Sequence, residues 1–421
     1  MKFPLPANTF PTLELPAADI AKIEALSSLL VEKTLGQYQE HQDARGGVVD
    51  LQRWKKVKQR QDIKVYKERV STPSRIGDGD YDEAAAPYRQ TDGVHYGDTV
   101  PVLMGVGTLI GSLDDVMYGV LNPTTESMRI KSVYTEDGFL DGTVLATLIA
   151  PSVVDPLRSL TLRWLLKRNP LIMTAVVRLR DVVYFESTGI ALTKTGERIG
   201  YQLLHSVELP GVRELVDEYQ IVRANVSFCY LYRQKTPEVV DVFMRGMLNP
   251  LGDVHPAVCV IATAEALVAV ERNVYCAQMK KLMWQLRRAK QPVQPVIVAD
   301  ATQCRICEQQ LSSSSFTLKK GARKRCCAVC LEQICSNCCE THRLNFMSSQ
   351  RHNAVAQNKL SFCVRWVQQA IATSAFEVAV DEVGEIRATF DDIFFLGGRT
   401  DSEVGTSSLS SSITSERSFF V

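Results

Sequence analysis

The hydrophobic and polar positions of the first 290 residues repeat with two different periods, and these periods predict the elements of the fold. Apolar residues recur every three or four positions over 17–40, which predicts an amphipathic helix. Alternating apolar and polar residues then predict a series of strands, over 54–58, 63–68, 102–110, 144–149, 176–188, 199–207 and 226–233. A long helix with one apolar face is predicted over 256–288.

The order of these elements indicates the fold class. Two short apolar stretches, 113–121 and 157–166, predict short helices between the strands, while the acidic, glycine-rich segment 78–98 predicts a loop or insertion. One helix, many antiparallel strands and a final long helix are typical of an α+β protein. We expect a curved antiparallel sheet whose apolar side is covered by the final helix.

Changes in composition divide the chain into four parts. Residues 1–15 form a lead segment with several prolines, 16–290 a large domain, and 298–382 a smaller domain, which we expect to end in a helix over 364–380. The tail 397–421 is rich in serine and has too few apolar residues to pack, so we expect it to be disordered.

Composition and charge exclude several classes of protein. Hydrophobic residues make up 45% and charged residues 23%, which is average for a soluble globular protein. The net charge of +1 provides no global field for nucleic acid, so no nucleic-acid partner is expected. The longest apolar stretch, 257–270, is too short for a membrane span, and prolines interrupt the first residues where a signal peptide would be apolar. We therefore predict a cytoplasmic protein in a reducing compartment.

Several landmarks of the large domain occur in a fixed order along the chain. They are Trp54 with Ile63-Lys64-Val65-Tyr66, then Leu179-Arg180-Asp181-Val182-Val183-Tyr184, then Leu204-His205-Ser206-Val207-Glu208, and finally 242–256 with Gly246 and Asn249-Pro250. As a set they resemble the START family of lipid-transfer domains, in a divergent START-like form, over roughly 17–288. The resemblance implies a helix-grip fold, in which the long helix closes a tunnel lined by the concave sheet, with a lipid as the ligand. The residues that would contact the lipid are not indicated by the sequence.

Enzymatic activity is not expected. The chain has no nucleophile elbow, phosphate-binding loop or zinc-protease helix. His205 has Ser206 and Glu208 as neighbours, but consecutive residues on a strand point to opposite faces and cannot form a triad locally. We name no catalytic residue.

Nine of the twelve cysteines lie between Cys304 and Cys363. They include three Cys-x-x-Cys pairs, which are Cys304 with Cys307, Cys327 with Cys330, and Cys335 with Cys338, followed by Cys363. Two thiolates at this spacing can reach one tetrahedral Zn²⁺ at about 2.3 Å, and four complete a structural site. A segment with so few large apolar residues needs such a metal to fold, so we predict zinc as the cofactor.

The spacing of these cysteines resembles a FYVE finger, and the resemblance implies a cross-braced pair of zinc sites. The first zinc would take Cys304, Cys307, Cys335 and Cys338, and the second would take Cys327, Cys330 and Cys363. The eighth ligand position holds Trp366, so the second site is incomplete. The missing ligand could come from Cys326, Cys339, His342, His352 or water.

FYVE fingers usually bind phosphatidylinositol 3-phosphate on endosomes, and all three of the family's head-group motifs are altered in this chain. They read Ile297-Val298-Ala299-Asp300, Arg323-Lys324-Arg325-Cys326-Cys327-Ala328 and Ser361-Phe362-Cys363, and the membrane-inserting loop reads Lys319-Lys320-Gly321. What remains is a basic cluster of Lys319, Lys320, Arg323, Lys324 and Arg325. Each base contributes ~1 kcal/mol near an anionic lipid surface. We expect at most weak, electrostatic contact with endosomal or other anionic membranes, and a solvated basic face is the alternative.

Two hypotheses for the function follow. The first is a non-enzymatic lipid-binding or lipid-sensing protein with a structural zinc-binding module. The second is a protein-interaction adaptor, with a filled START-like core and a zinc finger that binds a protein partner. A connected cavity of lipid size would favour the first, and a solidly packed interior the second.

Overall fold

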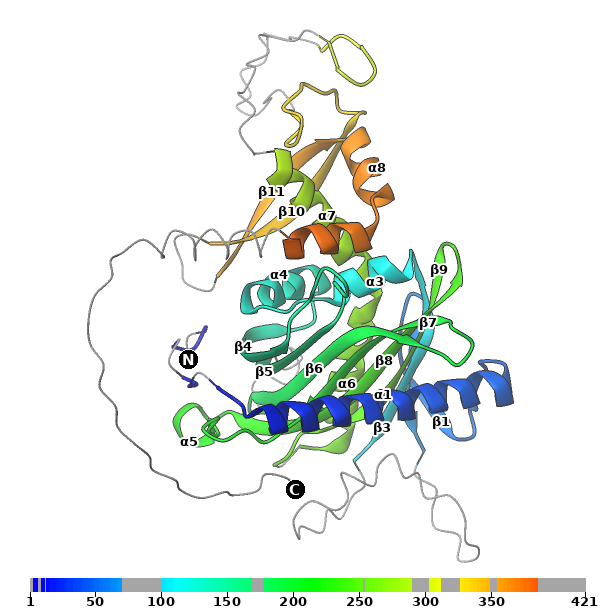
Figure 1. The fold of residues 1–421 in the computed structure, drawn as a ribbon, viewed down its shortest axis with the longest axis vertical. Helices are drawn as coiled ribbons and strands as arrows, with labels where there is room; N and C mark the ends of the chain where they lie inside the picture. The colour runs from blue at the N-terminus through cyan, green and yellow to red at the C-terminus, as the bar shows by residue number, and fades with distance from the viewer. Residues whose placement is uncertain are drawn as a thin grey trace, which may run out of the picture.

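The computed structural model describes residues 3–6, 9–11, 13–69, 100–168, 177–252, 254–289, 303–311, 326–348 and 354–384 (Figure 1). The predicted loop 78–98 and the predicted disordered tail 397–421 lie outside these residues.

A nine-stranded sheet forms the centre of the large part, with strand order β1-β2-β3-β9-β8-β7-β6-β5-β4. Its strands are β1 Trp54–Arg60, β2 Ile63–Glu68, β3 Val102–Ile110, β4 Phe139–Ile149, β5 Ser159–Lys167, β6 Arg180–Leu192, β7 Arg198–Ser206, β8 Val222–Thr236 and β9 Val239–Asn249. Neighbouring strands pair antiparallel, and β6 and β8 share a short additional parallel pairing. The expected α+β class with a large antiparallel sheet is confirmed.

Helices cover both faces of this sheet. The helix α1 (Ala17–Arg45) crosses one face, and the short α5 (Val216–Tyr219) follows β7. The helices packed against the other face are α3 (Leu113–Val120), α4 (Thr125–Thr135), α6 (Pro256–Val268), the 3₁₀ helix η3 (Ala269–Arg272) and α7 (Asn273–Ala289). Because strand side chains alternate, Tyr184 joins the core beneath α3 and α6, whereas Phe185 joins the core beneath α1.

The described residues of the smaller part form a hairpin and two helices that pack on α7 (Figure 1). The hairpin consists of β10 (Cys339–Met347) and β11 (Val355–Cys363), and α8 (Val364–Ala372) follows it directly. The predicted helix 364–380 is broken, since α8 ends at Ala372 and a second helix covers 375–384. Leu282 and Leu286 of α7 share one buried cluster with Phe362 and Val367.

Three sequence-based predictions for the large part were wrong or incomplete. The predicted helix 157–166 is the strand β5, whose residues from Ser159 to Leu166 are buried on both faces, so its sequence shows no alternation. The helix α4 and the strand β9 were not predicted. The long helix 256–288 exists, but η3 interrupts it.

None of the helices in the described residues is both long and apolar enough to cross a lipid bilayer.

Candidate functional site

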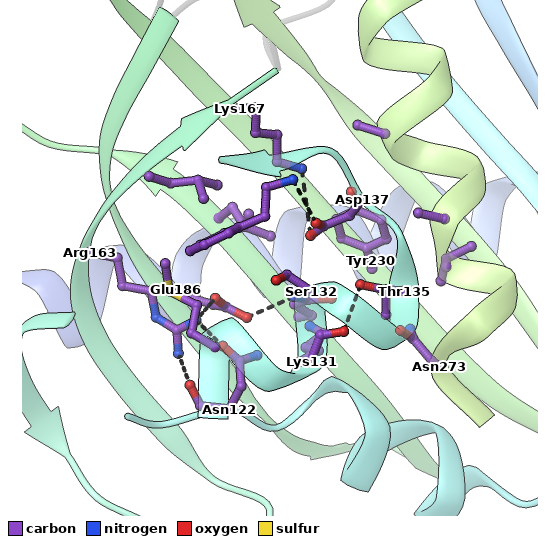
Figure 2. A pocket seen from close by; sticks show the side chains of 18 of the residues that line it. Asn122, Lys131, Ser132, Thr135, Asp137, Arg163, Lys167, Glu186, Tyr230 and Asn273 are labelled. Carbon is purple, nitrogen blue, oxygen red and sulfur yellow. Dashed lines mark hydrogen bonds and ion pairs between the residues drawn. The ribbon is translucent and has the colours of Figure 1, made fainter. Parts of the chain in front are cut away.

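A small cavity lies between the sheet and the helices that cover it (Figure 2). Its walls come from α4, from β4 to β8, and from the region where α6 passes through η3 into α7. Its volume is about 100 Å³, which is below the ~300–1,000 Å³ of most ligand pockets. This volume holds a few water molecules or one polar head group.

A buried ion pair forms one wall of the cavity. Arg163 of β5 contacts Glu186 of β6, and their side chains are only 2% and 3% exposed. The Arg163 guanidinium also donates to Thr161 Oγ1 at 2.7 Å and to the backbone oxygen of Asn122 at 2.8 Å. Gln202 Nε2 donates to Glu186 at 2.7 Å. The hydrogen bonds that the pair requires in a dry interior are therefore supplied by its neighbours.

Further polar groups line the same cavity (Figure 2). Lys131 of α4 donates from Nζ to the backbone oxygen of Val120 at 3.1 Å. Burial lowers the pKa of Lys131, and the charge of Glu186 opposes this shift. Burial, and after it the charge of Glu186, raises the pKa of the Tyr184 and Tyr230 hydroxyls, so both remain hydrogen-bond donors at neutral pH.

The covering helix changes its geometry at the cavity. Ala266, Ala269, Val270 and Asn273 all line it, and they lie where η3 interrupts the helix. A 3₁₀ stretch within a longer helix often marks a hinge. The 3₁₀ interruption of this covering helix, which we call the lid, therefore lies directly over the polar groups.

A second pocket lies beneath the lead segment, and its volume is about 390 Å³. Leu5 and Phe10 of the lead segment line it together with Trp164 of β5. Its polar wall is the buried pair of Arg129 and Asp141, 2.8 Å apart, and the Leu5 N–H donates to Asp141 at 2.6 Å. The lead segment is thus anchored over this pocket by a buried carboxylate.

The structure brings seven of the clustered cysteines together in two groups. One contains Cys304, Cys307, Cys335 and Cys338, and the other contains Cys327, Cys330 and Cys363, and within each group all sulfur atoms lie within 4.8 Å of one another. Both groups could hold a metal ion. Four sulfurs around a tetrahedral Zn²⁺ at about 2.3 Å would be about 3.8 Å apart, and the sulfurs of Cys307 and Cys335 are 3.7 Å apart. The four-thiolate group therefore fits zinc.

Backbone hydrogen bonds favour the thiolate form in both groups. The Cys335 N–H donates to the Cys304 sulfur at 3.3 Å, and the Cys363 N–H donates to the Cys327 sulfur at 3.3 Å. Burial raises the pKa of Cys304. The hydrogen bonds from the Cys335 N–H and from neighbouring N–H groups outweigh this effect and bring the pKa to about 6. Hydrogen bonding from Cys330 lowers the pKa of Cys327 to about 5. Burial raises the pKa of Cys338 to about 12 and also raises the pKa of Cys363. One cysteine of each group therefore has the thiolate character that a metal ligand requires.

The described residues place no fourth ligand in the group of Cys327. The Cys326 thiol donates to the Leu331 oxygen at 2.7 Å, and His342 Nε2 lies 3.4 Å from Glu340. The described candidates Cys326, Cys339 and His342 all lie outside the group. His352 and the basic cluster of Lys319, Lys320, Arg323, Lys324 and Arg325 lie outside the described residues.

Sequence reasoning missed the polar residues of the cavity. Arg163 lies in β5, which was predicted as a helix, and Glu186 lies in β6, where the sequence alone does not reveal which neighbours a charged side chain meets. Lys131 lies on α4, which was itself not predicted. The residue Thr124 accepts from the Ser127 N–H and caps this helix, and this capping pattern is the signal that could have located it.

Comparison with known proteins gives a weak similarity to lipid-transfer proteins. No known protein-family profile matches the chain, and no curated protein sequence matches it. Human StAR-related lipid transfer protein 5 has a TM-score of 0.40 and 12% identity, covering 61% of this chain and 97% of that one. Human STARD10 has a TM-score of 0.36 and 15% identity, covering 59% and 82%. A STAR-related lipid transfer protein from Xanthomonas axonopodis has a TM-score of 0.34 and 16% identity, covering 53% and 99%. Scores this low do not establish a shared fold.

Proposed function

We propose that this chain is a non-enzymatic lipid-binding or lipid-sensing protein of START-like, helix-grip architecture. The cavity between the sheet and the covering helix binds the polar head group of an amphiphilic ligand. The observation that supports this most is the fully buried pair of Arg163 and Glu186 in the cavity wall. A buried ion pair is often no more stable than apolar residues of the same volume, so its place beside a cavity suggests a ligand.

The apolar part of the ligand needs more space than the cavity offers. Leu165 and Leu204 continue the lining from the polar groups toward the core. Because η3 lies over this region, a rearrangement of the lid at 269–272 would give an acyl chain or ring system access to it. The cavity as described is the head-group end of this site.

The cysteine-rich part is a structural zinc module in this proposal. Tetrahedral sets of thiolate ligands suit zinc. The four-thiolate group would hold one zinc firmly, and the three-thiolate group would hold a second more weakly. When bound, zinc would supply the fixed cross-link around which 303–311 and 326–348 fold.

Lipid extraction tests the proposal. Purified protein is incubated with vesicles of phosphatidylcholine, phosphatidylserine and cholesterol, separated by gel filtration, and its bound lipid is measured. The double variant Arg163→Met/Glu186→Leu removes the pair in the cavity wall while keeping its volume, and Arg129→Met/Asp141→Leu is the matched control in the other pocket.

The wild type and the control should extract lipid, and the cavity variant should extract severalfold less while remaining folded by circular dichroism. Equal extraction by wild type and cavity variant would contradict the proposal. Loss of extraction in the control alone would move the site to the pocket beneath the lead segment.

A protein-interaction adaptor is the second candidate, and the small volume of about 100 Å³ favours it. In that case the core is filled, the zinc module binds a protein partner, and no vesicle composition yields extracted lipid. Under either function we place the protein in the cytoplasm.

The basic cluster from Lys319 to Arg325 makes at most weak contact with anionic membranes. Its attraction is screened over ~8 Å at physiological ionic strength. Liposome sedimentation should therefore show binding that falls steeply with salt and does not distinguish phosphatidylinositol 3-phosphate from other anionic lipids at equal charge. Salt-insensitive binding that requires the 3-phosphate would contradict this.

A further inference from the structure

The ionisable groups of the cavity between α4 and η3 do not balance in charge. Its lining contains three cations, Lys131, Arg163 and Lys167, and two carboxylates, Asp137 and Glu186. Arg163 pairs with Glu186 in the interior, and Lys167 lies 3.9 Å from Asp137 at a more exposed edge. Both carboxylates are therefore already paired, and Lys131 gives the lining a formal charge of +1.

Lys131 contacts a neutral group instead of an acid. Its ammonium donates to the Val120 backbone oxygen at 3.1 Å, and within the described residues it forms no ion pair. The negative charge that acts on it most strongly is that of Glu186, which already accepts from Gln202 and contacts Arg163. Burial without a counter-charge disfavours the ammonium form, and the pKa of Lys131 is accordingly lowered.

We infer that the cavity prefers an amphiphile whose head group is an anion, a carboxylate or a phosphate, which pairs with Lys131. This inference rests on the proposed lipid-binding function. An anion beside Lys131 would neutralise the charge of the lining. The low local dielectric would strengthen the attraction between this anion and the Lys131 ammonium. The protonated Tyr230 hydroxyl lines the same cavity and adds a donor for an anionic oxygen (Figure 2). A neutral alcohol or sterol hydroxyl would leave the ammonium without a counter-charge.

Three probes that differ only in the relevant group test this inference. Decanoate has the anion and the chain, decanol has the chain alone, and acetate has the anion alone. Binding of each to the full chain is measured by equilibrium dialysis, with wild type, Lys131→Met and Lys131→Arg compared. The arginine variant keeps the charge, so it separates loss of charge from a change in packing.

Wild type should bind decanoate roughly tenfold or more tighter than decanol, as expected for a hydrogen bond to a charged group. Lys131→Met should lose this preference while still binding decanol, and Lys131→Arg should retain most of it. Equal binding of decanoate and decanol by wild type would overturn the inference and leave the proposed function standing. Binding of neither would contradict the proposed function itself. Acetate binding as tight as decanoate binding would assign the site to a small free anion and overturn the inference that the ligand is an amphiphile.

Discussion

At the residue scale, several cysteines of the two groups belong to the hydrophobic core of the smaller part. Cys304, Cys327 and Cys363 are at most 1% exposed and share a buried cluster with Met279 and Leu282 of α7. A metal at these sulfurs would therefore hold together the packing as well as the local loops.

Serine substitutions should separate the two groups. In Cys304→Ser the four-thiolate group loses a ligand, and we expect loss of one zinc and unfolding of the module at 303–384. In Cys363→Ser the group is already short of one described ligand, so the loss of stability should be smaller. Zinc content by elemental analysis and thermal unfolding measure both effects. Equal destabilisation by both variants, with two zinc ions held by the wild type, would refute this difference.

His205 predicts a dependence of stability on pH. It lies 3.0 Å from Ser227 Oγ and packs beside Phe185, and burial lowers its pKa to about 4. Between about pH 6.5 and pH 4 the unfolded chain holds a proton here that the folded protein does not. The contribution of His205 is therefore complete above about pH 6.5 and is lost as the pH falls, by up to ~1.4 kcal/mol per pH unit.

His205→Gln should show a shallower fall of the unfolding free energy than wild type between about pH 6.5 and pH 4.5. Urea unfolding at several pH values measures this difference. Parallel curves for the two proteins would show that His205 does not titrate as its burial implies.

At the element scale, strands with one buried face were predicted correctly, whereas a strand buried on both faces was not. The strands β2 and β3 have the predicted bounds, since polar residues interrupt or flank their apolar ones. The strand β5 resembled a helix because both of its faces are buried, and Arg163 and Trp164 point into opposite cores. The spacing within each Cys-x-x-Cys pair is local, so these pairs could be read from the sequence. The grouping of Cys304 and Cys307 with Cys335 and Cys338 joins distant segments, and only the family resemblance implied it. The cavity likewise depends on which strands become neighbours, and no local pattern indicated its lining.

Lys281 of α7 is the element-scale link between the two parts. Its side chain is 1% exposed, and its ammonium lies 2.5 Å from Asp115, at the start of α3. It also donates to the Thr373 oxygen at 2.8 Å, just after α8. At Gly119 the two helices α3 and α7 come so close that a side chain would collide with the Asn273 oxygen.

Replacing this lysine should weaken the contact of all three helices. Lys281→Met leaves Asp115, whose side chain is 17% exposed, without its ammonium partner, so we expect a loss below the about 3–5 kcal/mol typical of breaking a fully buried pair. The double variant Lys281→Met/Asp115→Asn should recover part of this loss, because no uncompensated charge remains. Chemical denaturation measures both variants, and a single variant as stable as wild type would contradict the role of Lys281.

At the scale of the whole molecule, the cysteine-rich part packs against α4 and α7, two helices whose other residues line the cavity. Lys131 of α4 lines the cavity. Tyr134 on the same helix accepts a hydrogen bond from the Asn345 N–H of β10 at 2.8 Å. The helix α7 begins at the cavity with Asn273 and packs its later turns against β11 and α8. Two of the cavity walls thus depend on the module for their outer contacts (Figure 1).

Metal removal should therefore loosen the cavity walls. After treatment with a chelator, hydrogen exchange should become faster in α4 and α7 as well as in β10 and β11. The helix α1, on the opposite face of the sheet, serves as the internal control and should not change. Faster exchange confined to the cysteine-rich part would show that the two parts are energetically independent.

The central claim is that one chain holds a lipid in its helix-covered cavity and zinc at its cysteine groups. Native mass spectrometry of the purified full chain reports both at once. We predict a mass increase of at least one zinc ion together with a bound lipid that is lost in Arg163→Met/Glu186→Leu. A folded protein that lacks either the lipid or the zinc, even after incubation with vesicles and zinc salt, would contradict the claim.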